Sequence, residues 1–105
     1  MFENNEIKNP FKPDDKNGNI IYEAIREMAE KMDVSSIDRI YLDTCGMFNG
    51  YLTGKVFISI DTKSPMSDED FDVLFDTERS LEKEGFDICI GTEHIHDALG
   101  YLILY

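Results

Sequence analysis

The clearest helical pattern of apolar positions runs from Ile20 to Met32. Apolar residues recur there at spacings of three and four and fill one broad stripe, while the opposite face carries charged side chains. Arg26 and Glu30 stand four residues apart on that face, a spacing at which opposite charges pair. The Asn-Gly-Asn sequence at 17–19 offers an N-cap. We predict a helix over 20–32 whose apolar face packs on the core and whose charged face is exposed to solvent.

Two apolar stretches, 37–44 and 51–61, flank the dipeptide Asn49-Gly50, which strongly favours a two-residue type I′ turn. The pattern predicts a hairpin in which Phe48 pairs with Tyr51.

Continued along the strands, this register pairs Leu42 with Phe57. This register would place the alternating apolar residues of the first strand on one face of the sheet. It would place Val56, Ile58 and Ile60 of the second strand on the opposite face. Because a slip of one residue reverses the faces of a strand, we expect a bulge in the glycine-containing segments on either side of the turn, near position 46 or 54. The alternative is that both faces of the sheet are apolar.

A second helix has signals at both ends. Ser67 is a suitable N-cap with the acid Asp70 at the third helical position, and Gly85 followed by Phe86 fits a Schellman ending. The helix is predicted to span about 68–84.

Alternating apolar residues at 86–90 and the apolar segment 101–105 predict two more strands. The order is then α-β-β-α-β-β. We expect an α+β two-layer sandwich, with a four-stranded, mainly antiparallel sheet and both helices on one face. Residues 1–16 lack apolar periodicity and are predicted to be an irregular N-terminal arm before a single α+β domain at 17–105.

Val56-Phe57-Ile58 and the segment 101–105 are apolar on both sides of the strand. Helices on one face alone would leave part of these strands in water, so the arm, a second subunit or a target protein should cover the other face. Self-association as a homodimer is one expectation from this pattern. A structural subunit of a homo-oligomer is a corresponding alternative function.

The composition is that of a folded domain: 105 residues, 42% hydrophobic and 30% charged. The first residues lack the basic and apolar regions of a secretory signal, and no apolar run is long enough to span a bilayer. Cys45 and Cys89 are too far apart for a CxxC site and lie in apolar surroundings, where reduced core thiols are expected. These features favour a cytoplasmic location.

Acidic charge is concentrated between Ser67 and Asp97. Eleven of the chain's 22 acidic residues lie there with only two basic residues, Arg79 and Lys83, so this stretch carries −9 of the net charge of −12. A pI near 4.3 argues against direct binding to nucleic acid or to anionic membranes, and favours a basic partner protein.

Three of these acids, Asp68, Asp72 and Asp76, recur every four residues and should form a row with a spacing of about 6 Å along the predicted helix. With Glu69 they are the candidate partner-binding residues, and such a row could imitate the charges of a nucleic-acid backbone. The alternative is that acids near the start of a helix and bases near its end simply complement the helix dipole.

Two other groups could carry chemistry. Glu78 projects into the apolar stripe of the second helix, where it should have a raised pKa or a cation or backbone donor as partner. His94, His96 and Asp97 resemble a metal-binding group, although an HxH pair without a spaced third ligand is weakly specific. They support an alternative function as a small metal-dependent or acid/base enzyme.

No phosphate-binding loop, nucleophile elbow or HExxH motif is present, and no family resemblance is specific. We predict no cofactor. The leading hypothesis is a non-enzymatic interaction protein, a small acidic cytoplasmic domain that binds a basic partner and could inhibit it.

Overall fold

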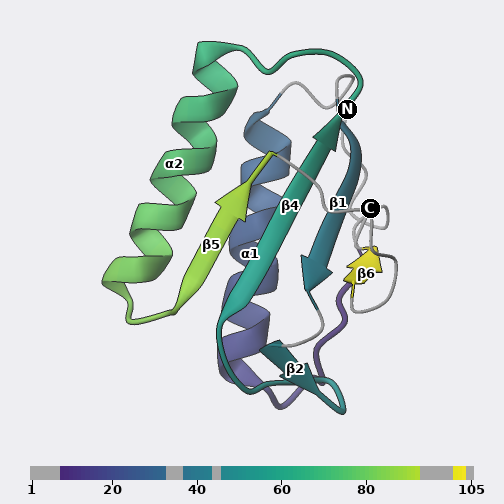
Figure 1. Ribbon diagram of the computed structural model, residues 1–105. Helices are drawn as coiled ribbons and strands as arrows, with labels where there is room; N and C mark the ends of the chain where they lie inside the picture. Colours follow the sequence, from purple (N-terminus) through teal and green to yellow (C-terminus); the bar gives the residue numbers. More distant parts are fainter. Residues whose placement is uncertain (1–7, 33–36, 44–45, 93–100, 104–105) are drawn as a thin grey trace.

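The computed structural model describes residues 8–32, 37–43, 46–92 and 101–103 (Figure 1). The elements in chain order are α1 (Lys16–Lys31), β1 (Ile37–Asp43), β2 (Met47–Phe48), β3 (Tyr51–Leu52), β4 (Val56–Thr62), α2 (Asp68–Lys83), β5 (Ile88–Gly91) and β6 (Tyr101–Ile103).

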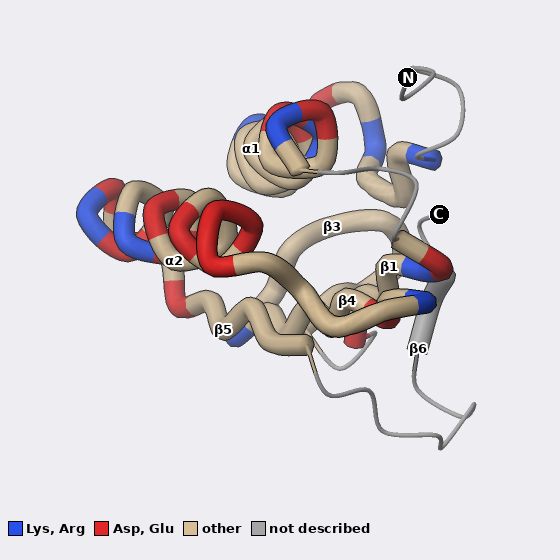
Figure 2. Tube along the Cα trace, turned by 90° about the horizontal axis from the view of Figure 1, so that it is seen from above, with Lys and Arg blue, Asp and Glu red and all other residues tan. Residues whose placement is uncertain are grey.

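The architecture is α+β, with both helices on one face of a sheet (Figure 2). The sheet has the order β5-β4-β1-β6, and β2 and β3 form a separate two-stranded sheet. β1 is antiparallel to β4 and to β6, whereas β4 and β5 are parallel. The expected class and the two-layer arrangement are confirmed, but the predicted four-stranded, mainly antiparallel sheet is not matched exactly, because the sheet is mixed. The parallel pair arises because α2 carries the chain back between two adjacent strands.

The core lies between the helices and the sheet. Along β4, Val56, Ile58 and Ile60 are buried, and Ile40 and Leu42 of β1 are buried beside them. The helices contribute the buried residues Ile21, Ile25, Met28, Ala29, Leu74 and Leu81, and β5 contributes Ile88 and Ile90.

The other face of the sheet bears a mixture of apolar and polar side chains. On β4, Phe57 is exposed and is followed on the same face by Ser59 and Asp61. As expected for 56–58, Val56 and Ile58 face the core while Phe57 is an apolar residue on the other face. The side chains of 101–105 lie outside the described residues. Cys89 points to this face and is exposed, so the prediction of a core thiol there was wrong. Cys45 lies outside the described residues.

The hairpin turn forms as predicted. Asn49 and Gly50 have φ values of 52° and 86°, which a type I′ turn requires, and Phe48 pairs with Tyr51. Beyond the turn the register changes, because Leu42 pairs with Ile58 and not with Phe57.

The change requires one extra residue on the second strand between Thr53, whose N–H donates to the Gly46 carbonyl at 2.9 Å, and Ile58. This confirms the expected correction, and it brings the apolar sets of β1 and β4 onto one face. A Cβ at Gly46 would collide with the carbonyl oxygen of Lys55, so a glycine permits this close approach.

The N-terminus of α1 differs from its prediction. The helix begins at Lys16, four residues earlier than expected, because Asp15 is the N-cap and its carboxylate accepts from the Gly18 N–H at 3.1 Å. The other oxygen of Asp15 accepts from the Leu52 N–H at 2.7 Å and so ties the hairpin to the helix.

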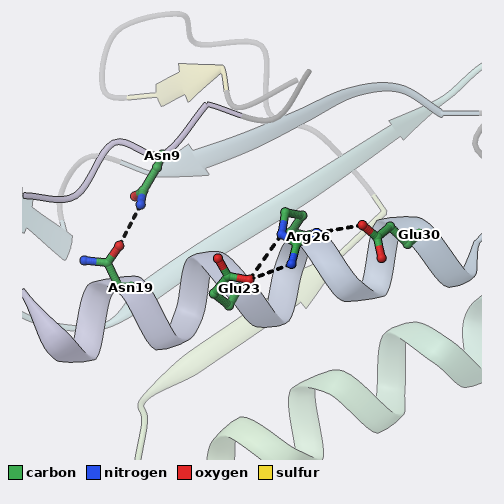
Figure 3. A network of polar contacts seen from close by, with 5 residues as sticks. All are labelled: Asn9, Asn19, Glu23, Arg26 and Glu30. Carbon is green, nitrogen blue, oxygen red and sulfur yellow. Dashed lines mark hydrogen bonds and ion pairs between the residues drawn. The ribbon is translucent and has the colours of Figure 1, made fainter. Parts of the chain in front are cut away.

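The described part of the arm, residues 8–15, packs beside this helix start. Phe11 is buried against the core. Asn9 donates to the Asn19 side chain at 2.6 Å (Figure 3), and the Asn19 amide in turn donates to the Lys12 carbonyl at 2.9 Å. These contacts anchor the arm to α1.

Both ends of α2 form as predicted. Ser67 accepts from the Asp70 N–H at 3.2 Å. At the other end Gly85 has a φ of 96°, and its N–H donates to Glu82 while the Phe86 N–H donates to Leu81, the two bonds of a Schellman motif.

Candidate functional site

The candidate site is the solvent face of α2. Leu74 and Leu81 fix the orientation of the helix because both are fully buried against the core. Asp68, Asp72 and Asp76 lie on the opposite side and are exposed, as is Glu69. Figure 2 shows acidic residues along much of α2, with basic residues at one end. The predicted row therefore exists on one helix face.

Not every acid of the helix belongs to this row. Asp70 is only 6% exposed, since it lies on the inward side next to the N-cap. The four predicted partner-binding residues are therefore exposed, whereas Asp70, which lies among them in the sequence, is buried.

Internal ion pairs account for only part of the charge. Asp76 pairs with Arg79 at 2.7 Å, and both side chains are well exposed. In the described part of the chain, which includes every lysine and arginine, no ion pair is formed by Asp68, Glu69 or Asp72.

The charged face of α1 is different. Arg26 lies between Glu23, at 2.8 Å, and Glu30, at 2.7 Å (Figure 3). Its hydrogen bond to Glu23 and the charges of both carboxylates raise the pKa of Arg26 above its ordinary value. The predicted pairing of Arg26 with Glu30 is confirmed, and one arginine serves two acids there. The acidity of α2 is less compensated than that of α1.

Two aromatic rings border the acidic row. Phe71 and Phe75 stack with their ring centroids 6.0 Å apart and their planes 20° from parallel. Phe71 is half-buried, and Phe75 is 46% exposed. Both rings belong to the apolar stripe of the helix, yet Phe75 is exposed. The sequence contains a signal for this exposure: at 100° per residue, Phe75 lies about 120° around the helix axis from the buried Leu81.

Glu78 lies on the β5 side of this helix. Its carboxylate accepts a hydrogen bond from the Ile90 N–H at 2.7 Å. Of the partners that the sequence left open, the backbone donor is the one observed. This hydrogen bond connects α2 to β5, so Glu78 has a structural role at the edge of the sheet.

A shallow groove of about 300 Å³ separates the two helices. Its charged lining residues are Glu27, Lys31, Asp76 and Glu84, with Ala24 and Val73 among its apolar ones. Three acids face one base, so the groove extends the negative surface from α2 towards α1.

The candidate metal ligands His94, His96 and Asp97 lie outside the described residues. Among the residues that are described, no group of three or more His, Cys, Asp or Glu side chains is placed to hold a metal ion.

Comparison with known proteins adds no relationship: the chain matches no family model, no curated protein and no solved structure. No helix within the described ranges is both long and apolar enough to cross a membrane.

Proposed function

We propose that this protein binds a basic partner protein through the solvent face of α2. Asp68, Glu69, Asp72 and Asp76 supply the charge for this contact. Because exposed charges act mainly on encounter and orientation, the row steers a cationic surface towards the helix.

The observation that carries the proposal is the uncompensated state of Asp72. It is exposed and makes no ion pair with any lysine or arginine of the chain, all of which belong to the described residues. The helix dipole acts within the first turn, so it accounts for Asp68 and Glu69 but not for acids further along the helix. A row of like charges costs stability, and a cationic partner would remove that cost.

Inhibition follows if the partner uses its basic groove for nucleic acid. The row repeats about every 6 Å along a rigid helix, so the helix would occupy such a groove as a charge mimic. Competition between this protein and an oligonucleotide for a basic binding protein measures this directly, and simultaneous binding of both would contradict the mimic.

The test of the proposal uses an oligolysine peptide as the cationic probe, titrated by isothermal calorimetry at low salt and at about 0.15 M salt. Asp72→Lys with Asp76→Lys should weaken binding by about tenfold, or roughly 1.4 kcal/mol. Asp68 is left unchanged because it lies in the first turn of the helix, where its charge favours folding.

The matched control is Glu30→Lys with Asp38→Lys, which makes the same change in net charge on α1 and β1. Both control positions are exposed and take part in surface ion pairs. The control loses two surface ion pairs and the test variant loses one, that of Asp76 with Arg79, so a weaker effect of the control cannot be ascribed to fewer lost contacts. Equal weakening by the two double variants would show that overall charge, and not the α2 face, attracts the probe.

A further inference from the structure

We propose that Phe71 and Phe75 form an anchor for an arginine side chain of the partner. This inference rests on the proposed function and adds the residue type that the α2 face selects. The occupant is an arginine-bearing segment of a basic protein.

The anchor combines an open aromatic surface with nearby acids. The two rings stack at 6.0 Å, so they present a continuous apolar surface along the helix, and Phe75 leaves 46% of its surface in solvent. On a helix, side chains three and four residues apart are neighbours. Asp68 is three residues before Phe71, and Asp72 is three residues before Phe75.

No lysine or arginine of the chain, all of which the structure describes, already occupies this surface. Within the described residues, which include every lysine and arginine, neither ring has a cation over it, whereas the Lys55 ammonium lies 5.0 Å from the centre of the Phe57 ring. Arg79 is four residues after Phe75, but its guanidinium is engaged with Asp76 at 2.7 Å. The rings and the carboxylate of Asp72 are therefore available together.

Arginine fits this combination better than lysine. A guanidinium is planar, so it stacks on an aromatic face while its N–H groups donate sideways to a carboxylate. An ammonium is compact and strongly hydrated, and it gains less from the ring. Arginine is also one of the residues in which the energetic hot spots of protein interfaces are enriched.

The experiment compares oligoarginine and oligolysine peptides of equal length, titrated against the full chain at the same salt concentration. The wild-type protein should prefer oligoarginine. Phe75→Leu should weaken oligoarginine binding by about threefold to tenfold, the range expected from loss of a cation–π contact, and leave oligolysine binding nearly unchanged. Phe75→Tyr, which keeps a ring face, should retain the preference for arginine.

Ile20→Ala is the matched control because Ile20 is an apolar residue on the other helix with a similar exposure of 42%. It should leave binding of both peptides unchanged. Thermal unfolding of each variant verifies the fold. If Phe75→Leu does not fold, Phe75→Met, which also removes the ring, takes its place with the same expected loss of the arginine preference.

The outcomes separate the two proposals. Loss of binding in Asp72→Lys with Asp76→Lys, together with an unaltered arginine preference in Phe75→Leu, would overturn the anchor and leave the acidic face standing. No preference for oligoarginine in the wild type would also overturn the anchor. Conversion of a dimer to a monomer by Phe75→Leu in sedimentation would show that a second copy of the chain covers these rings, which overturns the anchor as well.

Discussion

The carboxylate of Glu78 accepts the backbone N–H of Ile90 at 2.7 Å and joins α2 to the outer edge of the sheet. β5 stands at the end of the strand order, and within the described residues it pairs with β4 alone. An unpaired N–H on such an edge is a template for pairing with another chain. Here a side chain from the covering helix satisfies it, so Glu78 protects the edge as well as orienting the helix.

Replacement of Glu78 tests this role. Glu78→Ala should lower the free energy of unfolding by about 1–3 kcal/mol, because a hydrogen bond to a charged group is lost and the Ile90 N–H is left without its acceptor. Glu78→Gln, which keeps an acceptor oxygen, should cost less. Urea unfolding followed by circular dichroism measures both. The control is Glu82→Ala, an exposed position one turn further on, and an equal loss there would contradict the specific role of Glu78.

Gly18 lies within α1, where alanine is normally the more stable residue, but the neighbouring side chains leave no room for a Cβ. A Cβ at this position would collide with the ring of Phe11 and lie 2.6 Å from a carboxylate oxygen of Asp15. A glycine-to-alanine change in a helix ordinarily stabilises by about 1 kcal/mol. We expect Gly18→Ala to have the opposite sign and to destabilise by about 1–3 kcal/mol through overpacking.

Gly54→Ala is the matched control in the same denaturation experiment, because nothing lies within 4 Å of a Cβ at Gly54. It should leave stability nearly unchanged. A stabilised Gly18→Ala variant would show that the arm moves aside without cost.

The phenol of Tyr51 should titrate at unusually high pH. Its hydroxyl donates to Asp14 at 2.9 Å, and this bond, with desolvation and the carboxylate charge, raises the pKa of Tyr51 above its ordinary value of 10.0. A raised pKa in the folded state means that the contribution to stability is complete below the unfolded pKa and disappears as the pH rises through the folded pKa.

The measurement is the ultraviolet absorbance of tyrosinate as a function of pH, taken as the difference between the wild type and Tyr51→Phe. The midpoint of that difference should lie above the ordinary value, and Asp14→Asn should lower it because the negative charge is gone. A midpoint unchanged by Asp14→Asn would contradict the assigned cause.

The parts of the fold that depend on neighbouring residues were predictable. The ends of α2 follow from Ser67 and Gly85, whose caps are made within a few residues of the helix. The hairpin turn follows from Asn49-Gly50 for the same reason. Even the register correction was foreseeable, since the apolar faces of β1 and β4 had to agree.

Other parts depend on contacts between distant segments. The N-cap of α1 is at Asp15 and not at 17–19, and the same carboxylate also binds the Leu52 N–H, a partner 37 positions away. The sequence did not predict that β5 runs parallel to β4, because the alternation of apolar and polar residues along a strand is the same for parallel and antiparallel pairing. Neither result can be obtained from a local pattern.

The candidate site divides in the same way. By itself the sequence determined that acids recur every four residues on one capped helix, because helical periodicity converts spacing into a row. Helical projection places Phe75 near the border of the apolar stripe, but only the tertiary structure decided how much of its ring is exposed. Only the tertiary structure decided that the Glu78 carboxylate binds the edge strand of the sheet. The reason is physical: exposure and pairing depend on where a helix sits against its neighbours, and that position is set by packing over the whole core.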